Sequence, residues 1–496
     1  MAKQLTEEQQ KIISTSQSML LGESLKIQAC AGSGKTSTLV EISKANPNST
    51  FLYLAFNKSI VDEAKNKFPD NVNVKTTHSL AYSSIIAPNK YAVVPKHTFF
   101  DLKDILELSD YEKFSNFNKE LNYFLNSSQN TTTNPLIERL FTLARNGEIP
   151  YTHSMYLKEY QMLSTEQKKL DKYDFILLDE AQDTNGVTLG IFLDNKCRKI
   201  VVGDTFQNIY GFRDTVNALE RLKTNYEESL TRSFRCTQSI LSKACYFLNK
   251  YSDTNKKVWF ESGFEEKANM PKNQALITRT NCGIIEAIAS NLNADEKEAK
   301  KYKLIKEPDS IFAISLSCYH LKNGNFSSIH KDYKWINKFS NITDLENFAE
   351  LTYDVELLKA IKLVEKYDKQ LFLFYDEAKK MFKSNDFNIY LTNAHISKGL
   401  EWDIVTLKND FPPIADIQES LYDAIKKKDI HNINIISKNL QQEVNLYYVA
   451  LTRAKDKVID RTDNNVEYSA FIDDLKEKQK QNNIIQQNRY QIRKRR

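Results

Sequence analysis

One short stretch, IQACAGSGKTSTL at residues 27–39, constrains the fold of the 496-residue chain more than any other. It begins in an apolar run and ends in a helical pattern, so it joins a strand to a helix. Glycines in such a loop let backbone N–H groups converge on phosphate oxygens, a lysine reaches the β- and γ-phosphates, and a hydroxyl binds Mg²⁺. The stretch therefore predicts a nucleotide site on an α/β sheet, with Gly32, Gly34, Lys35 and Thr36 at the spacing of a P-loop.

The loop departs from the usual pattern at its first position, where Ala29 stands in place of glycine. A single imperfect match can arise by chance in a long chain, so the surrounding sequence decides its meaning. Glycine is scarce here, and each one is expected where the backbone geometry requires it. Five of the 12 glycines fall inside sequence motifs: Gly32, Gly34, Gly203, Gly211 and Gly399.

An acidic strand end supports the nucleotide site. The apolar run at 175–178 leads directly into Asp179 and Glu180. A P-loop ATPase places one such carboxylate on its metal ion and a second beside the attacking water. Paired carboxylates on a surface loop are common, but after four strand-like apolar residues in a chain with a P-loop they indicate catalysis. The sequence therefore predicts ATP hydrolysis, with Thr36 and Asp179 as ligands of Mg²⁺.

Short apolar runs alternate with helical patterns in two parts of the chain. They lie at 25–29, 50–56, 173–180 and 199–204 in the first part, and at 274–280, 387–394 and 402–407 in the second. Such alternation is typical of parallel sheets flanked by helices. Polar, aromatic-rich helical stretches interrupt both parts, and we interpret them as inserted domains. They could instead be long disordered loops, but their many Tyr, Phe and Leu residues favour folded insertions.

These patterns predict the domain boundaries. The first α/β domain comprises 1–82 and 173–227 around a helical insertion at 83–172. The second comprises 228–290 and 388–475 around an insertion at 291–387, and residues 476–496 form a basic, flexible tail.

Composition excludes several classes of protein. The net charge is +5, too small to identify a nucleic-acid binder by itself. The six cysteines are scattered singly, which argues against a zinc or iron–sulfur site and for a reduced, intracellular protein. The N-terminal sequence has no apolar signal segment, and no apolar window is long enough to span a membrane. We expect a cytoplasmic, nucleoid-associated protein.

Five further segments occur in the order and at the spacing of one known family. They are DEAQD at 179–183, VGDTFQNIYGFR at 202–213, LTRSFR at 230–235, TNAHISKGLEWD at 392–403 and YYVALTRAK at 447–455. On these segments the chain resembles superfamily 1 helicases of the UvrD/Rep/PcrA type. LAFNKSIVDEA, TTHSLAY and KGLEWD resemble the F-box DNA helicase branch in particular, although we expect no F-box. The resemblance implies two RecA-like P-loop motor domains, each with an inserted, mainly helical domain.

The resemblance also implies which residues surround the base and ribose. Gln9 matches a glutamine that reads the adenine edge, Phe234 an aromatic residue that stacks on adenine, and Glu401 a carboxylate near the ribose. Relatives often carry arginine directly after the GKT sequence, where this chain has Ser37. Adenine selectivity would then rest more on Gln9 and Phe234, and we hypothesise a looser base preference.

On the phosphate side, the resemblance makes Gln207 a γ-phosphate sensor and Arg235 a γ-phosphate ligand. Arg453 matches the arginine finger of the second motor domain, a role that suits a permanently charged guanidinium. The predicted catalytic residues are Lys35, Asp179, Glu180, Gln207, Arg235 and Arg453. The predicted nucleotide-binding loop comprises Ala31, Gly32, Ser33, Gly34, Lys35, Thr36 and Ser37.

A motor on single-stranded nucleic acid needs aromatic platforms and phosphate contacts. The resemblance implies that Tyr210 and Phe212 insert between bases and that Arg213 links the strand to ATP. A lone histidine is ordinarily a satisfied core residue, but the motifs around His78 and His395 favour DNA contact. The further positions that match phosphate or base contacts are Asn57, Lys58, Thr77, His78, Thr392 and His395.

The sequence thus predicts an ATP-dependent helicase that moves along single-stranded DNA, 3′→5′ by resemblance, through closure of two motor domains. Its partners would be single-stranded and tailed duplex DNA, and no membrane. One alternative is a motor subunit that strips proteins, or works with a separate nuclease, in a repair, recombination-control or anti-phage complex. Another is an ATP switch that clamps a protein partner without translocation. Pathway, oligomeric state and the choice between DNA and RNA stay open.

Overall fold

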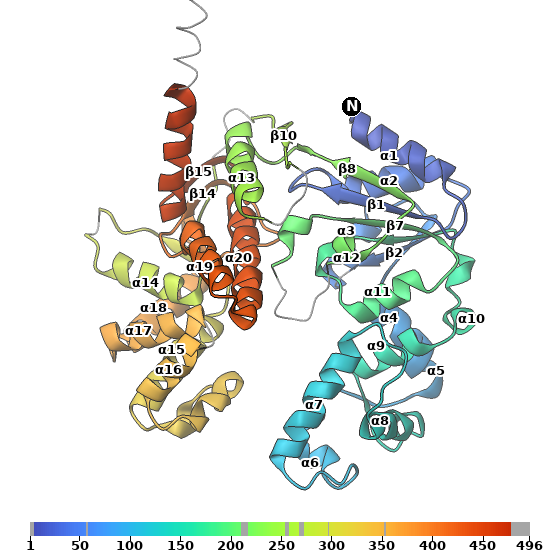
Figure 1. Cartoon of the computed structure of the whole chain (residues 1–496), viewed down its shortest axis with the longest axis horizontal. Helices are drawn as coiled ribbons and strands as arrows, with labels where there is room; N and C mark the ends of the chain where they lie inside the picture. The colour runs from blue at the N-terminus through green and yellow to red at the C-terminus, as the bar shows by residue number, and fades with distance from the viewer. Residues whose placement is uncertain are drawn as a thin grey trace, which may run out of the picture. The chain divides into compact units, whose positions relative to one another are not determined.

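The chain divides into two units, residues 1–234 and 235–496. Each unit contains one large β-sheet whose strands are parallel (Figure 1). The computed structural model describes residues 4–55, 58–209, 217–252, 257–266, 272–295, 297–351 and 354–477. Within that part of the chain, the predicted α/β class with parallel sheets is confirmed.

Six strands form the sheet of the first unit, and every neighbouring pair is parallel. From edge to edge they are β3 (Val72–Thr76), β2 (Phe51–Ala55), β6 (Phe175–Leu178), β7 (Arg198–Gly203), β1 (Ser24–Ala29) and β8 (Tyr226–Leu230). β2 and β6 are buried at every residue, which accounts for their uninterrupted apolar sequences. Because the strands are parallel, the loops that follow β1, β2 and β6 all lie at one edge of the sheet.

Alternate side chains of β2 enter two different apolar cores. Tyr53 packs in a cluster with Ile12 of α1 (Glu7–Ser18) and Leu39 of α2 (Lys35–Ala45). Leu52 points to the opposite face, where its cluster includes residues of the helices between β3 and β6. Helices therefore cover both faces of this sheet, which also carries α3 (Lys58–Lys65), α11 (Gly186–Leu193) and α12 (Ala218–Arg221).

Helices dominate the segment between β3 and β6. They are α4 (Thr77–Ala81), α5 (Ala87–Asn89), α6 (Phe99–Leu102), α7 (Tyr111–Asn126), α8 (Pro135–Arg145), α9 (His153–Met162) and α10 (Thr165–Lys168). Their buried side chains, such as Phe114, Leu140 and Tyr156, belong to the same cluster as Leu54 and Ile176 of the sheet. These helices thus share one continuous core with a face of the sheet.

The second unit has a five-stranded sheet with all neighbouring strands parallel. Its strands run in the order β12 (Tyr302–Leu304), β13 (Ile389–Asn393), β11 (Gln274–Thr278), β14 (Trp402–Leu407) and β15 (Ala454–Asp460). α13 (Gln238–Tyr251) and α14 (Asn281–Leu292) accompany the sheet. Between β12 and β13 in sequence lie α15 (Pro308–Lys322), α16 (Ile342–Leu351), α17 (Val355–Tyr367) and α18 (Gln370–Lys383). These helices share one apolar core with α14 and with Leu304 and Leu391 of the sheet.

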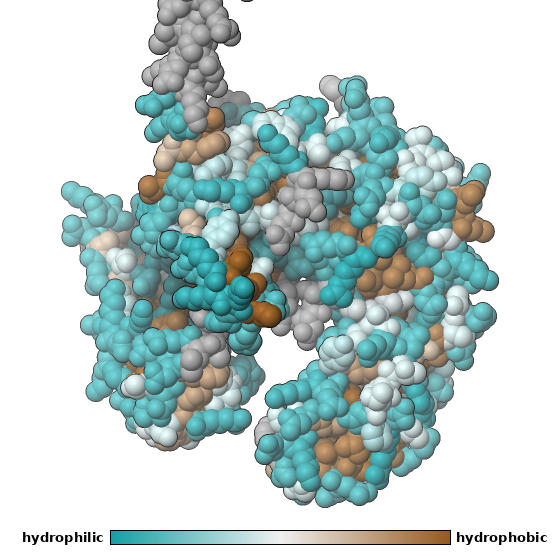
Figure 2. Space-filling model, viewed as in Figure 1, coloured by the Kyte–Doolittle hydropathy of each residue, from teal (hydrophilic) through white to brown (hydrophobic). Residues whose placement is uncertain are grey.

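Two long helices, α19 (Ile414–Lys426) and α20 (Ile430–Leu451), connect β14 to β15 and pack along each other. The sequence patterns did not single out this hairpin. Hydrophilic side chains cover most of the face drawn in Figure 2, and an apolar patch marks the end of the hairpin, where Tyr422, Ile425 and Ile430 are exposed. In the residues that the structure describes, no helix has the length and apolar character to cross a membrane.

Gly203, the last residue of β7, offers a test of this packing. A Cβ atom there would lie 2.4 Å from Oε1 of Gln182, 3.0 Å from Leu219 and 3.1 Å from the backbone nitrogen of Ala181. We expect Gly203→Ala to lower the free energy of unfolding by about 1–3 kcal/mol, because a packed interior resists added volume. Chemical denaturation of the full chain measures this loss.

Gly190→Ala is the matched control. Its Cβ would come no closer than 3.3 Å to a neighbour, the flexible side chain of Gln161. Alanine also stabilises a helix interior by about 1 kcal/mol relative to glycine, so we expect little or no loss. Equal losses in the two variants would contradict the packing argument.

Candidate nucleotide site

The loop that follows β1 has a backbone conformation suited to phosphate. Gly32 and Gly34 adopt left-handed φ values of 73° and 83°, which glycine reaches without strain. The N–H and hydroxyl of Ser33 both donate to the carbonyl of Cys30, at 3.3 and 2.9 Å, and so tie the loop together. α2 begins at Lys35, and its amino terminus favours an anion at the loop.

Two contacts join this loop to the acidic end of β6. The Thr36 hydroxyl donates to Oδ2 of Asp179 at 2.9 Å. The Lys35 ammonium lies 3.3 Å from Oε1 of Glu180. The structure therefore brings together the four side chains that the sequence selected for ATP, Mg²⁺ and water.

Asp179 is buried, with 7% of it exposed. Burial raises the pKa of Asp179, and the negative charge of Glu180 acts in the same direction, while Lys35 opposes both. A cation placed against this carboxylate would relieve the cost of ionising it in the interior.

The residues present fit Mg²⁺. This ion prefers carboxylate and hydroxyl oxygens and takes only one or two carboxylates from the protein when phosphates complete its coordination. Thr36 and Asp179, in direct contact, supply such oxygens. No cluster of three or more His, Cys, Asp or Glu side chains that could hold a metal occurs among the described residues.

Glu180 is held by a chain of buried polar groups. Its backbone has a left-handed φ of 50°. Nε2 of Gln182 donates to Oε2 of Glu180 at 2.6 Å, and Oε1 of Gln182 accepts the N–H of Asp204 at 3.1 Å. Asp204 in turn accepts from Nε2 of Gln207 at 2.8 Å. The predicted water-activating carboxylate and the predicted γ-phosphate sensor are therefore connected, through Gln182 and Asp204, to which the sequence analysis gave no role.

Tyr53 is a further residue that the sequence analysis missed. Its hydroxyl donates to Oδ2 of Asp179 at 2.9 Å, the oxygen that also accepts from Thr36. The side chain is fully buried on β2, and burial, reinforced by Asp179, raises the pKa of Tyr53 far above its usual value. A tyrosine in the otherwise apolar FLYLA run was the available signal, because a buried hydroxyl needs a partner.

On the base side, the predicted residues lie near the loop. Nε2 of Gln9 donates to the Thr38 hydroxyl at 3.1 Å, and Oε1 of Gln9 accepts the Thr6 N–H at 3.1 Å. The backbone N–H of Phe234 donates to the carbonyl of Gly32 at 2.9 Å, which ties the backbone of Phe234 to the loop. Ser37 is exposed on α2. Each of the two Gln9 bonds uses one of the two hydrogen-bonding positions on its atom of the Gln9 amide.

In the second unit, the predicted Arg235, Glu401 and Arg453 occupy one region. Nε of Arg235 donates to Oε2 of Glu401 at 2.8 Å, and Lys455 lies 3.0 Å from Oε1. Burial opposes the charge of Glu401, but Arg235 and Lys455 outweigh burial and lower its pKa. Arg453 is 1% exposed and donates from Nη1 to the carbonyl of Leu400 at 3.2 Å. Lys455 is an addition, visible in the sequence as the cation after ALTRA.

The predicted DNA contacts are less complete. Thr77 and His78 line a cavity of about 270 Å³ beside Asp179 in the first unit. Burial lowers the pKa of His78, and its ring meets that of Tyr156 edge-on, with centroids 5.8 Å apart. Thr392 is fully buried, whereas His395 is half-buried. Asn57, Tyr210, Phe212, Arg213 and the Lys58 side chain lie outside the described residues.

Comparisons with known proteins bear on this arrangement. A family model described as the UvrD-like helicase C-terminal domain matches residues 89–459. F-box DNA helicase protein 1 of Schizosaccharomyces pombe is 29% identical over 92% of this chain and 57% of its own. F-box DNA helicase 1 of Gallus gallus is 26% identical over 91% of this chain and 48% of its own length. A mitochondrial ATP-dependent DNA helicase of Saccharomyces cerevisiae is 24% identical over 50% of this chain and 41% of its own length. The chain spans about half the length of these relatives.

Tyr53→Phe tests the contact with Asp179. Outer-shell partners of a metal typically change metal affinity or activity by about 10–100-fold, so we expect half-maximal ATP hydrolysis at about 10-fold more Mg²⁺. Loss of this donor also raises the pKa of Asp179, which moves the acid limb of the pH–rate profile to higher pH. Steady-state hydrolysis across Mg²⁺ concentrations and pH measures both effects.

Tyr160→Phe is the control for loss of a buried hydroxyl, because Tyr160 bonds only to the carbonyl of Lys168 in α10 among the described residues. It should leave the Mg²⁺ dependence unchanged. If Tyr53→Phe behaves like this control, Tyr53 does not position Asp179.

Proposed function

The chain belongs to the UvrD-like helicase family, and on that premise we propose that it is an ATP-dependent helicase that moves along single-stranded DNA in the 3′→5′ direction. The observation that carries the proposal is the pair of contacts Lys35–Glu180 and Thr36–Asp179. They supply phosphate binding, a metal carboxylate and a water-activating carboxylate at one sheet edge, which are the parts that phosphoryl transfer needs.

We further propose that the two units are RecA-like motor domains with inserted domains, as the sequence predicts. Support comes from the parallel sheet in each unit and from the helices that fall between their strands in sequence. The proposed boundary at residue 227 lies within β8, a few residues before the division of the units after Phe234.

In this proposal, each charged side chain has one task. Lys35 binds the β- and γ-phosphates, Thr36 and Asp179 hold Mg²⁺, and Glu180 takes the proton of the attacking water. Mg²⁺ would neutralise charge on the phosphates during transfer. Gln207, Arg235 and Arg453 complete the machinery: Gln207 responds to the γ-phosphate, and the arginines stabilise the charge that develops on it.

Movement requires that the two motor domains change their grip on DNA with the nucleotide state. We propose that ATP draws the arginines of the second domain onto the phosphates held by the first. Hydrolysis then releases them, and the strand advances because the closed and open states differ in affinity for it. Support for this cycle comes from the family and from the division of lysine and arginines between the two units.

The principal test is hydrolysis and unwinding beside a Lys35→Ala control. We expect single-stranded DNA to raise the ATPase rate at least about 10-fold, and unwinding of 3′-tailed duplexes only. Lys35→Ala should abolish both, because the phosphate ligand is lost. A fluorescence unwinding assay with 3′-tailed, 5′-tailed and blunt duplexes measures the direction.

Other outcomes identify the alternatives. Unwinding from 5′ tails alone overturns the direction. Stimulated hydrolysis without unwinding indicates a motor that strips proteins or serves a separate nuclease. A rate unaffected by single-stranded DNA or RNA rejects the motor and leaves an ATP switch.

Base selectivity gives an independent prediction. With Ser37 in place of an arginine and exposed at the surface, we expect similar hydrolysis rates, within about 3-fold, for ATP, GTP, CTP and UTP. Ser37→Arg should restore a preference for ATP. Strict dependence of the wild-type chain on ATP would refute the idea that this position sets the base preference.

A further inference from the structure

A cavity of about 620 Å³ lies in the second unit among α14, α17 and the segment that follows β14. Four lysines line it, against two carboxylates, Glu286 and Asp410. We call it the lysine pocket, defined by Lys359, Lys362, Lys366 and Lys408. None of the helicase motifs supplies these lysines.

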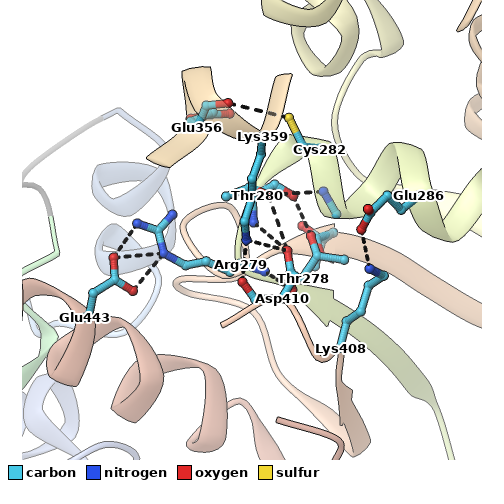
Figure 3. Close-up of polar contacts among 12 residues, drawn as sticks. Thr278, Arg279, Thr280, Cys282, Glu286, Glu356, Lys359, Lys408, Asp410 and Glu443 are labelled. Carbon is cyan, nitrogen blue, oxygen red and sulfur yellow. Dashed lines mark hydrogen bonds and ion pairs between the residues drawn. The ribbon is translucent and has the colours of Figure 1, made fainter. Parts of the chain in front are cut away.

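Both carboxylates of the pocket are bound by other groups of the protein (Figure 3). Asp410 accepts the backbone N–H groups of Arg279 and Thr280 at 2.8 and 3.2 Å, at the start of α14. Burial raises the pKa of Asp410, against which Lys359 acts. Glu286 pairs with Lys408 at 2.6 Å. These contacts fix the shape of the pocket, and the ion pair with Glu286 also neutralises Lys408, so the remaining positive charge is that of the α17 lysines.

The packing around Asp410 leaves no room for an added methyl group. A Cβ atom on Gly283, in the first turn of α14, would lie 2.1 Å from Oδ2 of Asp410. Nearby, Arg279 is held by Glu443, with its Nε 2.9 Å from Oε2 (Figure 3). The wall of the pocket is therefore tightly packed and held by specific polar contacts.

The lysines of α17 retain positive charge toward the pocket. Nζ of Lys359 donates to the carbonyl of Asp410 at 2.6 Å and stands 4.0 Å from its carboxylate, and burial lowers the pKa of Lys359. Lys362 and Lys366 are exposed, and no carboxylate comes within ion-pair distance of either in the part of the chain that the structure describes. Tyr367 adds an aromatic surface, with the Lys366 ammonium 4.8 Å from its ring centre.

We propose that the lysine pocket binds consecutive phosphate groups of a nucleic-acid strand. The inference rests on the proposed function as a DNA motor, and adds a contact outside its motifs. Residues three, four and seven apart lie on one face of a helix, so the three lysines of α17 form a row about 10 Å long. Each strand of duplex DNA carries one phosphate per about 3.4 Å of helix axis, so a row of cations this long matches several successive phosphates rather than a single small anion.

The chemistry of the lining agrees with a nucleic-acid strand. Lysines bind phosphate as point charges and tolerate any base sequence, and the aromatic ring beside them suits sugar or base contact. The pocket would therefore add affinity without sequence preference.

The test is a charge reversal at the two exposed lysines, Lys362→Glu with Lys366→Glu. Removal of two phosphate contacts should weaken binding of a labelled tailed duplex at least about 10-fold at low salt. It should also make the slope of log affinity against log salt shallower by about 1.4–1.8. Fluorescence anisotropy of the full chain across salt concentrations, without nucleotide, measures both quantities.

The matched control is Lys379→Glu with Lys383→Glu on α18, which has the same charge change and spacing and lies outside the pocket lining. It should leave affinity and slope unchanged. Unaltered DNA binding in the pocket variant, or an equal loss in the control, overturns the proposal. Equal melting temperatures of the three proteins show that any change is not unfolding.

Two further measurements are needed. One distinguishes a nucleic-acid strand from a small free anion, and the other distinguishes failure of the pocket proposal from failure of the proposed motor function. Tripolyphosphate that binds the wild-type chain but not the pocket variant, with DNA binding unaltered, would make the ligand a small free anion and overturn the nucleic-acid assignment. ATPase at saturating single-stranded DNA should be stimulated equally in the wild type and the variant. Absence of stimulation in the wild type defeats the motor, whereas the anisotropy result judges the pocket by itself.

Discussion

A single oxygen, Oδ2 of Asp179, is the point on which the nucleotide site depends. It accepts hydrogen bonds from Thr36, after β1, and from Tyr53, on β2, while its own residue follows β6. Three separate segments of chain thus converge on one buried atom. A buried acceptor that loses a donor costs about 1–3 kcal/mol, so these contacts hold the sheet edge as well as the chemistry.

The parallel sheet makes that convergence possible. Strands that run in one direction deliver their carboxyl ends to one edge, and the residues that follow β1, β6 and β7 all contribute to the site. The second unit gathers charge at the amino ends of its strands instead, since Lys455 lies at the start of β15. There Glu401, just before β14, holds Arg235 and Lys455 within hydrogen-bonding distance. Cations that would otherwise scatter over the surface are gathered around one carboxylate.

The sequence was sufficient for features that depend on short-range pattern. The P-loop, the acidic end of β6 and the parallel sheets follow from glycine positions and apolar runs, and the strand at 402–407 has the predicted bounds. Contacts between side chains on different strands could not be predicted from a single amino-acid sequence. Tyr53 and Asp179 are 126 positions apart, and only the pairing of β2 with β6 makes them neighbours. Gln182, Lys455 and the α19–α20 hairpin were missed for the same reason: their roles depend on tertiary partners.

The helices between β3 and β6 also affect how this part of the molecule unfolds and how it transmits force. Their side chains and those of Leu54 and Ile176 form one apolar cluster. Cooperative units follow such cores rather than the borders of sequence insertions. Residues 83–172 would therefore melt together with the sheet, and mechanical load applied to these helices would pass directly into the strands that carry Asp179.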